Sequence, residues 1–111
     1  MYVYLIGHSS DMFIHTYIGV TDNFDERLKE HNDSTKWFPI MVLECTNRLA
    51  SQLQAEWGRG KFGAEDRIRK GFKLVNKYCI RAYVADIKLG LLSQMPEGEV
   101  KTLSAEFWDA L

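Results

Sequence analysis

At 111 residues the sequence has the length of one domain, and 46% hydrophobic residues are enough for a small core. No apolar run reaches the roughly 18 residues that a transmembrane helix needs, and the first residues lack the basic region of a signal peptide, so we expect a cytoplasmic protein. A net charge of −1 argues against a protein that binds nucleic acid over its whole surface.

The first part of the chain predicts two strands followed by a helix. The segments Val3–Ile6 and Phe13–Val20 are rich in β-branched and aromatic residues, and they could pair as an antiparallel hairpin. Asn23 is followed three residues later by Glu26, which is the spacing of a capping box. We therefore expect a helix that continues to about His31.

The rest of the chain predicts further short elements in an α+β arrangement, with helices beside a small sheet. In chain order they are a strand at Ile40–Cys45 entered through Pro39, a helix capped by Thr46 or Asn47 that runs to about Gly58, a short helix near Ala64–Lys70, a strand within Tyr78–Ile87 and a terminal amphipathic helix at Leu103–Leu111. We expect a single domain over residues 1–111, with a core of about residues 1–88 and a C-terminal extension of about residues 89–111.

Basic residues are concentrated between Gly58 and Arg81, where eight basic side chains stand against two acidic ones. Such a stretch can be the electrostatic footprint of a phosphate-binding surface, but a solvated, lysine-rich helix is an equally good interpretation. Cys45 and Cys79 are far apart and lack the spacing of a zinc ribbon, so we expect two buried free thiols in strands.

Several polar residues could carry chemistry, although each has an ordinary structural explanation. Tyr4 and Tyr17 lie on strands that are expected to pair, and a strand tyrosine is more often packing than a catalytic base. Arg27 and His31 share one face of the first helix, as solvated side chains often do. Glu56 follows the apolar stripe of the second helix, and alone it predicts no function.

Taken together, these residues resemble the GIY-YIG nuclease family. Val3-Tyr4-Leu5 stands at the first family triplet, Tyr17-Ile18-Gly19 matches the second, and 12 residues separate the two tyrosines. The run from Arg27 to Asn32 is similar to the Arg-Leu-x-x-His helix of the family, and Ala55-Glu56-Trp57 matches the position of its metal-binding glutamate. The run Trp37–Leu43 resembles the nuclease subunit of structure-selective junction-cutting complexes. The resemblance covers about residues 1–60.

The resemblance implies a small, mostly antiparallel three-stranded sheet flanked by helices, with an added C-terminal strand and short helix. It also implies a DNA endonuclease in which Tyr4 is the general base, Tyr17 orients water or phosphate, and Arg27 binds the phosphate. His31 then donates to a phosphate oxygen or orients the attacking water. Glu56 is then the ligand of a single Mg²⁺ or Mn²⁺ ion, which suits a carboxylate. The phenol of Tyr4 has an ordinary pKa near 10, so either Arg27 or the metal lowers it, or the phenol passes its proton on during attack.

Further residues are expected to contact the substrate. Arg67, Arg69, Lys73 and Lys77 are predicted to follow the DNA backbone without reading bases. Gly19 is expected to leave room for the substrate backbone at a strand end. Many family members carry an asparagine after the glutamate helix, for which Asn76 is the candidate.

Two other functions remain open. The chain could be a GIY-YIG module that binds nucleic acid without cutting it, which metal binding near Glu56 tests. It could also be a partner-binding domain, or form a homodimer, through a C-terminal helix that carries Phe107, Trp108 and Leu111. For the nuclease, branched or duplex DNA is the expected substrate, because no separate sequence-reading domain is present.

Overall fold

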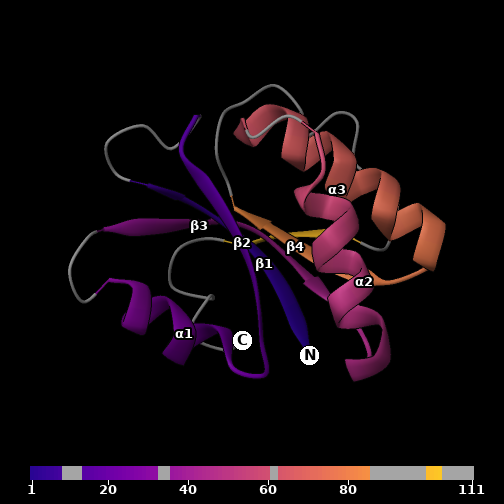
Figure 1. Ribbon diagram of the computed structural model, residues 1–111, viewed down its shortest axis with the longest axis horizontal. Coiled ribbons are helices and arrows are strands. Elements are labelled where there is room, and N and C mark those ends of the chain that lie inside the picture. Colours follow the sequence, from indigo (N-terminus) through magenta and orange to yellow (C-terminus); the bar gives the residue numbers. More distant parts are fainter. Residues whose placement is uncertain (9–13, 33–35, 61–62, 86–99, 104–111) are drawn as a thin grey trace.

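A five-stranded sheet forms the centre of the computed structural model, which describes residues 1–8, 14–32, 36–60, 63–85 and 100–103 (Figure 1). The strand order is β2-β1-β3-β4-β5, and all neighbouring pairs are antiparallel except β4 and β5, which are parallel. The strands are β1 (Tyr2–His8), β2 (Thr16–Thr21), β3 (Trp37–Glu44), β4 (Arg81–Ala85) and β5 (Val100–Leu103). The predicted α+β class is confirmed: β1 to β4 form an antiparallel sheet, which matches the three strands expected together with the added C-terminal strand, and β5 is a further strand.

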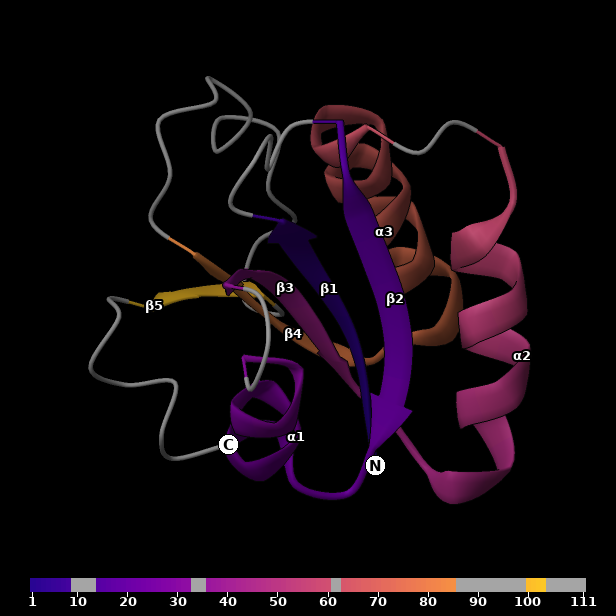
Figure 2. The same ribbon diagram turned by 60° about the vertical axis from the view of Figure 1, so that its left-hand side comes forward.

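Three helices cover the two faces of this sheet. Helix α1 (Phe24–His31) packs on one face, and α2 (Asn47–Gly58) and α3 (Ala64–Tyr78) lie together on the other (Figure 2). The molecule is therefore built in three layers, with the sheet in the middle. Among the described residues, no helix is long and apolar enough to cross a membrane.

The alternation of side chains along the strands gives each face its own core. The α2–α3 face holds the larger core, which includes Val3, Leu5, Ile18, Met41, Leu43, Leu53, Trp57, Ile68, Val75 and Val84. The α1 face holds a smaller one around Tyr4, Ile6, Phe24, Val42 and Ala85. The register of β1 against β3 shifts between Leu5 and Ile6, so that Ile40 and Met41 both join the larger core.

The predicted boundaries of α1 and α2 are confirmed, whereas α3 is twice as long as expected. The prediction ended α3 near Lys70 because Gly71 follows, yet the helix continues through Gly71 to Tyr78. A Cβ at Gly71 would lie 2.6 Å from Met41 Sδ, so the glycine lets the helix approach β3 closely. Tertiary packing thus outweighs the low helix propensity of glycine.

This longer helix moves the elements that follow it. Tyr78 is helical, so β4 begins only at Arg81. Cys79 ends α3 in the left-handed conformation, with φ of 51°, and is exposed, while Cys45 is half-buried just after β3. Neither cysteine is a buried strand residue, so that prediction was wrong.

The C-terminal extension contributes a strand that the sequence did not predict. Residues Val100–Leu103 form β5 beside β4, so Leu103 is a strand residue and not the start of a helix. Residues 104–111, where the rest of the predicted terminal helix falls, lie outside the described part of the chain.

The close approach at Gly71 can be tested by substitution. We expect Gly71→Val to lower the free energy of unfolding by about 1–3 kcal/mol, because the added methyl groups must displace Met41 and Trp57. Urea denaturation measures this change. Gly58→Ala is the matched control, since a Cβ there meets nothing within 4 Å and should leave stability equal or raise it by up to about 1 kcal/mol. Equal stabilities for the two variants would contradict the packing argument.

Candidate active site

Tyr4 is the central residue of a polar cluster on the α1 face of the sheet. Its side chain extends from β1 and is 1% exposed. The hydroxyl lies 2.8 Å from Nε2 of His31 and accepts a hydrogen bond from Nε of Arg27 at 3.4 Å. Arg27 and His31 lie one turn apart on α1, and both therefore reach the same hydroxyl. We call Tyr4, Tyr17, Arg27 and His31 the Tyr4 cluster.

Gly19 gives Tyr4 the space that its ring needs. The two residues are paired across β1 and β2. A Cβ built on Gly19 would overlap the hydroxyl and the ring carbon that carries it. The glycine is therefore required by the tyrosine beside it, a packing reason that the sequence did not indicate.

The start of α1 fixes how the helix presents Arg27 and His31. Asn23 caps the helix, and its Oδ1 accepts from the backbone N–H of Glu26 at 3.1 Å. Phe24 follows directly, is completely buried, and its ring lies 5.4 Å from that of Tyr4. The capped, buried first turn holds α1 against the sheet, so that its next turns lie over Tyr4.

Tyr17 completes the cluster from the neighbouring strand. Its ring centroid lies 6.2 Å from that of Tyr4 and 5.1 Å from that of His31. Unlike Tyr4, it is 40% exposed. Tyr17 thus forms the solvent-facing side of the cluster, where a ligand can touch its hydroxyl.

The surroundings of the cluster favour the uncharged forms of Tyr4 and His31. Burial raises the pKa of Tyr4, and this outweighs the hydrogen bond from Arg27, which lowers it. Burial also lowers the pKa of His31, and the charge of Arg27 lowers it further. The hydrogen bonds to Tyr4 and Glu30 raise the pKa of Arg27. At neutral pH the cluster therefore contains a neutral phenol, a neutral imidazole and one guanidinium.

These shifts bear on the idea that Arg27 lowers the pKa of Tyr4. The pKa of the phenol is raised and not lowered, so Arg27 does not produce a standing phenolate. A neutral His31 can accept the phenolic proton at Nε2 when its own proton is on Nδ1. Tyr4 is thus arranged to pass a proton to His31.

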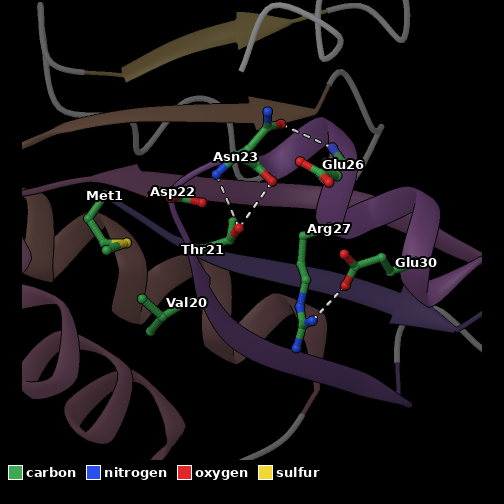
Figure 3. A pocket seen from close by; sticks show the side chains of 8 residues that line it. All are labelled: Met1, Val20, Thr21, Asp22, Asn23, Glu26, Arg27 and Glu30. Carbon is green, nitrogen blue, oxygen red and sulfur yellow. Dashed lines mark hydrogen bonds and ion pairs between the residues drawn. The ribbon is translucent and has the colours of Figure 1, made fainter.

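A solvent-filled pocket of about 520 Å³ opens beside Arg27 (Figure 3). It is lined by Met1, Val20, Thr21, Asp22, Asn23, Glu26, Arg27 and Glu30. The guanidinium of Arg27 is 44% exposed, and its Nη1 donates to Glu30 at 2.7 Å. An exposed pair of this kind contributes little stability, so an anionic ligand can take the place of Glu30.

Glu56 lies in a different layer from the Tyr4 cluster. It belongs to α2, and its carboxylate accepts from Nζ of Lys77 at 2.9 Å and from the hydroxyl of Tyr78 at 2.6 Å, both on α3. These two bonds lower the pKa of the carboxyl group, with that from Tyr78 contributing most. The structure thus brings together four of the five predicted catalytic residues and turns the fifth towards α3.

Glu56 suits a hard cation as a donor. The carboxylate is ionised at neutral pH, its side chain is 21% exposed, and Mg²⁺ is commonly held by one or two carboxylates with water completing its shell. A cation there must replace the ammonium of Lys77. The described residues contain no group of three or more His, Cys, Asp or Glu side chains that could hold a metal.

The predicted DNA contacts separate into buried and exposed residues. Arg67 is 5% exposed and donates from Nη1 to Thr16 Oγ1 at 2.8 Å, so it cannot follow a DNA backbone at the surface. Arg69 pairs with Glu65 at 2.8 Å. A pocket of about 260 Å³ between α2 and α3 is lined by Glu56, Arg59, Lys70, Lys73, Leu74 and Lys77.

Some residues of these sites had no signal that assigned them a role. Arg59 and Lys70 were counted in the basic stretch, but only the long α3 places them beside Lys73. Tyr78 was assigned to a strand, and therefore its bond to Glu56 could not be foreseen. Trp37 contacts Tyr17 and His31 with ring distances of 6.2 and 6.1 Å, which no local pattern indicates.

The comparisons with known proteins agree with the motif order. A family model described as the GIY-YIG catalytic domain matches residues 1–39, which include every member of the Tyr4 cluster. No curated protein gives a significant match to the chain.

The lowered pKa of His31 can be measured by NMR titration of the histidine ring protons, with His31→Gln used to assign the signal. We expect a midpoint below 6.5 in the unsubstituted protein. Arg27→Gln removes a repelling positive charge and should raise that midpoint, although burial keeps it below the ordinary value.

Lys29→Gln is the control, because it removes a cation of the same helix that pairs with Asp25. The midpoint of His31 should then stay where it is. A midpoint above 6.5 in the unsubstituted protein would show that the imidazole is not held neutral.

Proposed function

Because the chain belongs to the GIY-YIG superfamily, whose domains are generally endonucleases, we propose that it hydrolyses phosphodiester bonds in DNA at the Tyr4 cluster. The observation that carries the proposal is the hydroxyl of Tyr4, which lies in hydrogen-bond reach of both Arg27 and His31. This arrangement joins a phosphate-binding cation to a path for a proton, and hydrolysis of a phosphodiester needs both.

In the proposed reaction Tyr4 and His31 act as one base. A water attacks phosphorus and gives its proton to the phenol oxygen, while the phenol passes its own proton to Nε2 of His31. The P–O bond to the leaving group breaks, and the leaving oxygen takes a proton from His31 or from solvent. This route needs no free phenolate, in agreement with the raised pKa of Tyr4.

Arg27 and Tyr17 bind the phosphate in this mechanism. The guanidinium of Arg27 is fixed at Nε by Tyr4, which leaves its outer nitrogens to bind phosphoryl oxygens once Glu30 is displaced. The half-exposed Tyr17 can donate its hydroxyl to the phosphate or the attacking water. Each contact stabilises the charge that develops on the phosphoryl group.

A divalent cation, Mg²⁺ or Mn²⁺, is part of the proposal, because GIY-YIG nucleases are generally dependent on divalent metals. Glu56 would hold it, with water as the other ligands. When bound, such an ion would neutralise charge on a phosphate beside α2 and α3. In the structure Glu56 faces Lys77 and Tyr78, so a loaded site requires these two contacts to open.

Duplex DNA would also contact the basic pocket between α2 and α3. Lys73 and Lys77 from the original prediction, joined by Arg59 and Lys70, place four cations around one carboxylate. Contacts of this kind position a backbone and carry no sequence information. The pocket and the Tyr4 cluster belong to opposite layers, which favours branched DNA, whose arms can follow both faces.

A second function is favoured by one observation. The carboxylate of Glu56 is already bound by two residues of α3, in a layer that the Tyr4 cluster does not share. A protein that keeps this arrangement when DNA is bound is a nucleic-acid-binding module without catalysis.

The nuclease proposal is tested with labelled linear duplex, flap, splayed-arm and four-way-junction DNA in Mg²⁺, Mn²⁺ or EDTA. We expect metal-dependent cutting, which Tyr4→Phe reduces about 10²- to 10⁴-fold because the proton path is lost. Arg27→Ala should reduce it about 10²- to 10³-fold. Glu56→Gln should abolish the dependence on metal together with most of the activity.

Lys29→Ala is the control for Arg27→Ala, because it removes a cation of the same helix that pairs with Asp25. Its rate should equal that of the unsubstituted protein. Binding of all four DNAs without cutting, in either metal, would establish the non-catalytic module. Full activity in Tyr4→Phe would remove Tyr4 from the mechanism.

The role of the basic pocket is tested by the salt dependence of DNA binding, measured by fluorescence anisotropy. Each lysine that neutralises a phosphate contributes close to one unit to the slope of log K against log salt. Lys73→Ala should therefore reduce the slope by about one, whereas Lys29→Ala should leave it unchanged. An unaltered slope in Lys73→Ala would place the DNA elsewhere.

A further inference from the structure

A second pocket lies beside the Tyr4 cluster, and the proposed reaction does not use it. It has a volume of about 500 Å³ and is lined by His8, Ile14, His15, Thr16 and Trp37. These residues come from the end of β1, the segment that leads into β2, and the start of β3. We call it the Trp37 pocket.

Aromatic rings dominate this pocket. The ring of Trp37 lies 5.0 Å from that of His8 in an edge-to-face arrangement, and His8 lies 6.4 Å from His15. Ile14, at 62% exposure, adds an apolar side chain at the surface. Among the described residues that line it there is no carboxylate.

The Trp37 pocket is continuous with the Tyr4 cluster. The ring of Trp37 lies 6.2 Å from that of Tyr17 and 6.1 Å from that of His31. Thr16, which lines the pocket, precedes Tyr17 in β2. A ligand that places a phosphate against Tyr17 therefore has its next chemical group at the edge of the Trp37 pocket.

These features suit a nucleobase better than a sugar or a phosphate. A base has flat apolar faces that stack on aromatic rings. A base inside a duplex is covered on both faces by its neighbours and cannot reach such a pocket without unstacking. Only an unpaired base can enter at little cost.

We propose that the Trp37 pocket binds an unpaired nucleobase of the DNA, next to the phosphate at the Tyr4 cluster. This inference rests on the proposed function and deepens it, because it makes the junction between paired and unpaired DNA the preferred substrate. By stacking one unpaired base, the protein selects DNA by its structure. The DNA sequence matters little, since every base has a face that stacks.

The test combines substitutions in the protein with removal of one base from the DNA, and it measures the affinity of binding. All variants carry Tyr4→Phe, which slows cutting. The probe is a fluorescein-labelled flap DNA whose first unpaired nucleotide carries either a base or an abasic sugar. Loss of the base should weaken binding about tenfold, which is typical of one stacked base. In Trp37→Leu, removal of the base should hardly change the binding affinity, because the ring on which the base stacks is no longer present.

Two further variants separate stacking from loss of fold. Ile14→Ser changes an exposed lining residue that the core does not need, and it should reduce the effect of the base. Phe38→Leu is the matched control: it follows Trp37 in β3, is 45% exposed and faces the other side of the sheet. It should keep the full tenfold effect.

The proposal would be overturned if removal of the base weakened binding equally in Trp37→Leu and in the protein that keeps Trp37. An abasic effect that Phe38→Leu removes as fully as Trp37→Leu would also overturn it, because the binding would then not be at the pocket. Since the readout is binding, this result stands apart from the cutting assay, in which failure of the nuclease proposal appears as uncut DNA in every metal.

Discussion

The packing of one tyrosine between β2 and α1 is the constraint on which the α1 face depends. Tyr4 is almost wholly buried, yet its hydroxyl must be satisfied, because a buried polar group without a partner is costly. Arg27 and His31 of α1 lie within hydrogen-bond distance of the hydroxyl, and Gly19 of β2 leaves room for the ring. The triplet Tyr17-Ile18-Gly19 therefore has a packing explanation as well as a chemical one, since any side chain at its last residue would overlap Tyr4 of the neighbouring strand.

The sheet separates two kinds of surface. The α2–α3 face contains most of the apolar core, and helix α3 carries its basic residues other than Arg67 on the outside of that layer. The α1 face has a smaller core, with few large side chains besides Tyr4, Phe24 and Ile6. A single short helix lies on this face, whereas two packed helices cover the opposite one (Figure 2). Beside the single helix, Tyr17 is 40% exposed and Trp37 is partly exposed. The difference in helix cover explains why the polar cluster and the Trp37 pocket occur together on one side.

What could be predicted from the sequence was local. The capping box fixed the start of α1, and a spacing of four placed Arg27 and His31 on one face. Strand pairing and helix geometry thus predicted the two pairs of the Tyr4 cluster, and the family resemblance joined them. The failures came from contacts between distant segments. Gly71 is tolerated in α3 because Met41 and Trp57 lie against it, and β5 exists because β4 offers it an edge. The burial of Arg67 and the partners of Glu56 depend on that same long helix, and no local pattern of charge could have revealed them.

The charge of Arg27 gives the proposed proton path its direction. In the resting protein it lowers the pKa of His31, which keeps the imidazole neutral and ready to accept. A phosphate bound to Arg27 offsets that charge, so His31 becomes a better acceptor at the moment when a substrate is present. After the transfer, the protonated imidazole is again disfavoured by burial, and this favours release of its proton to the leaving oxygen. Burial of the pair thus opposes a standing charge on either Tyr4 or His31, and the substrate itself supplies the compensation that lets the proton move.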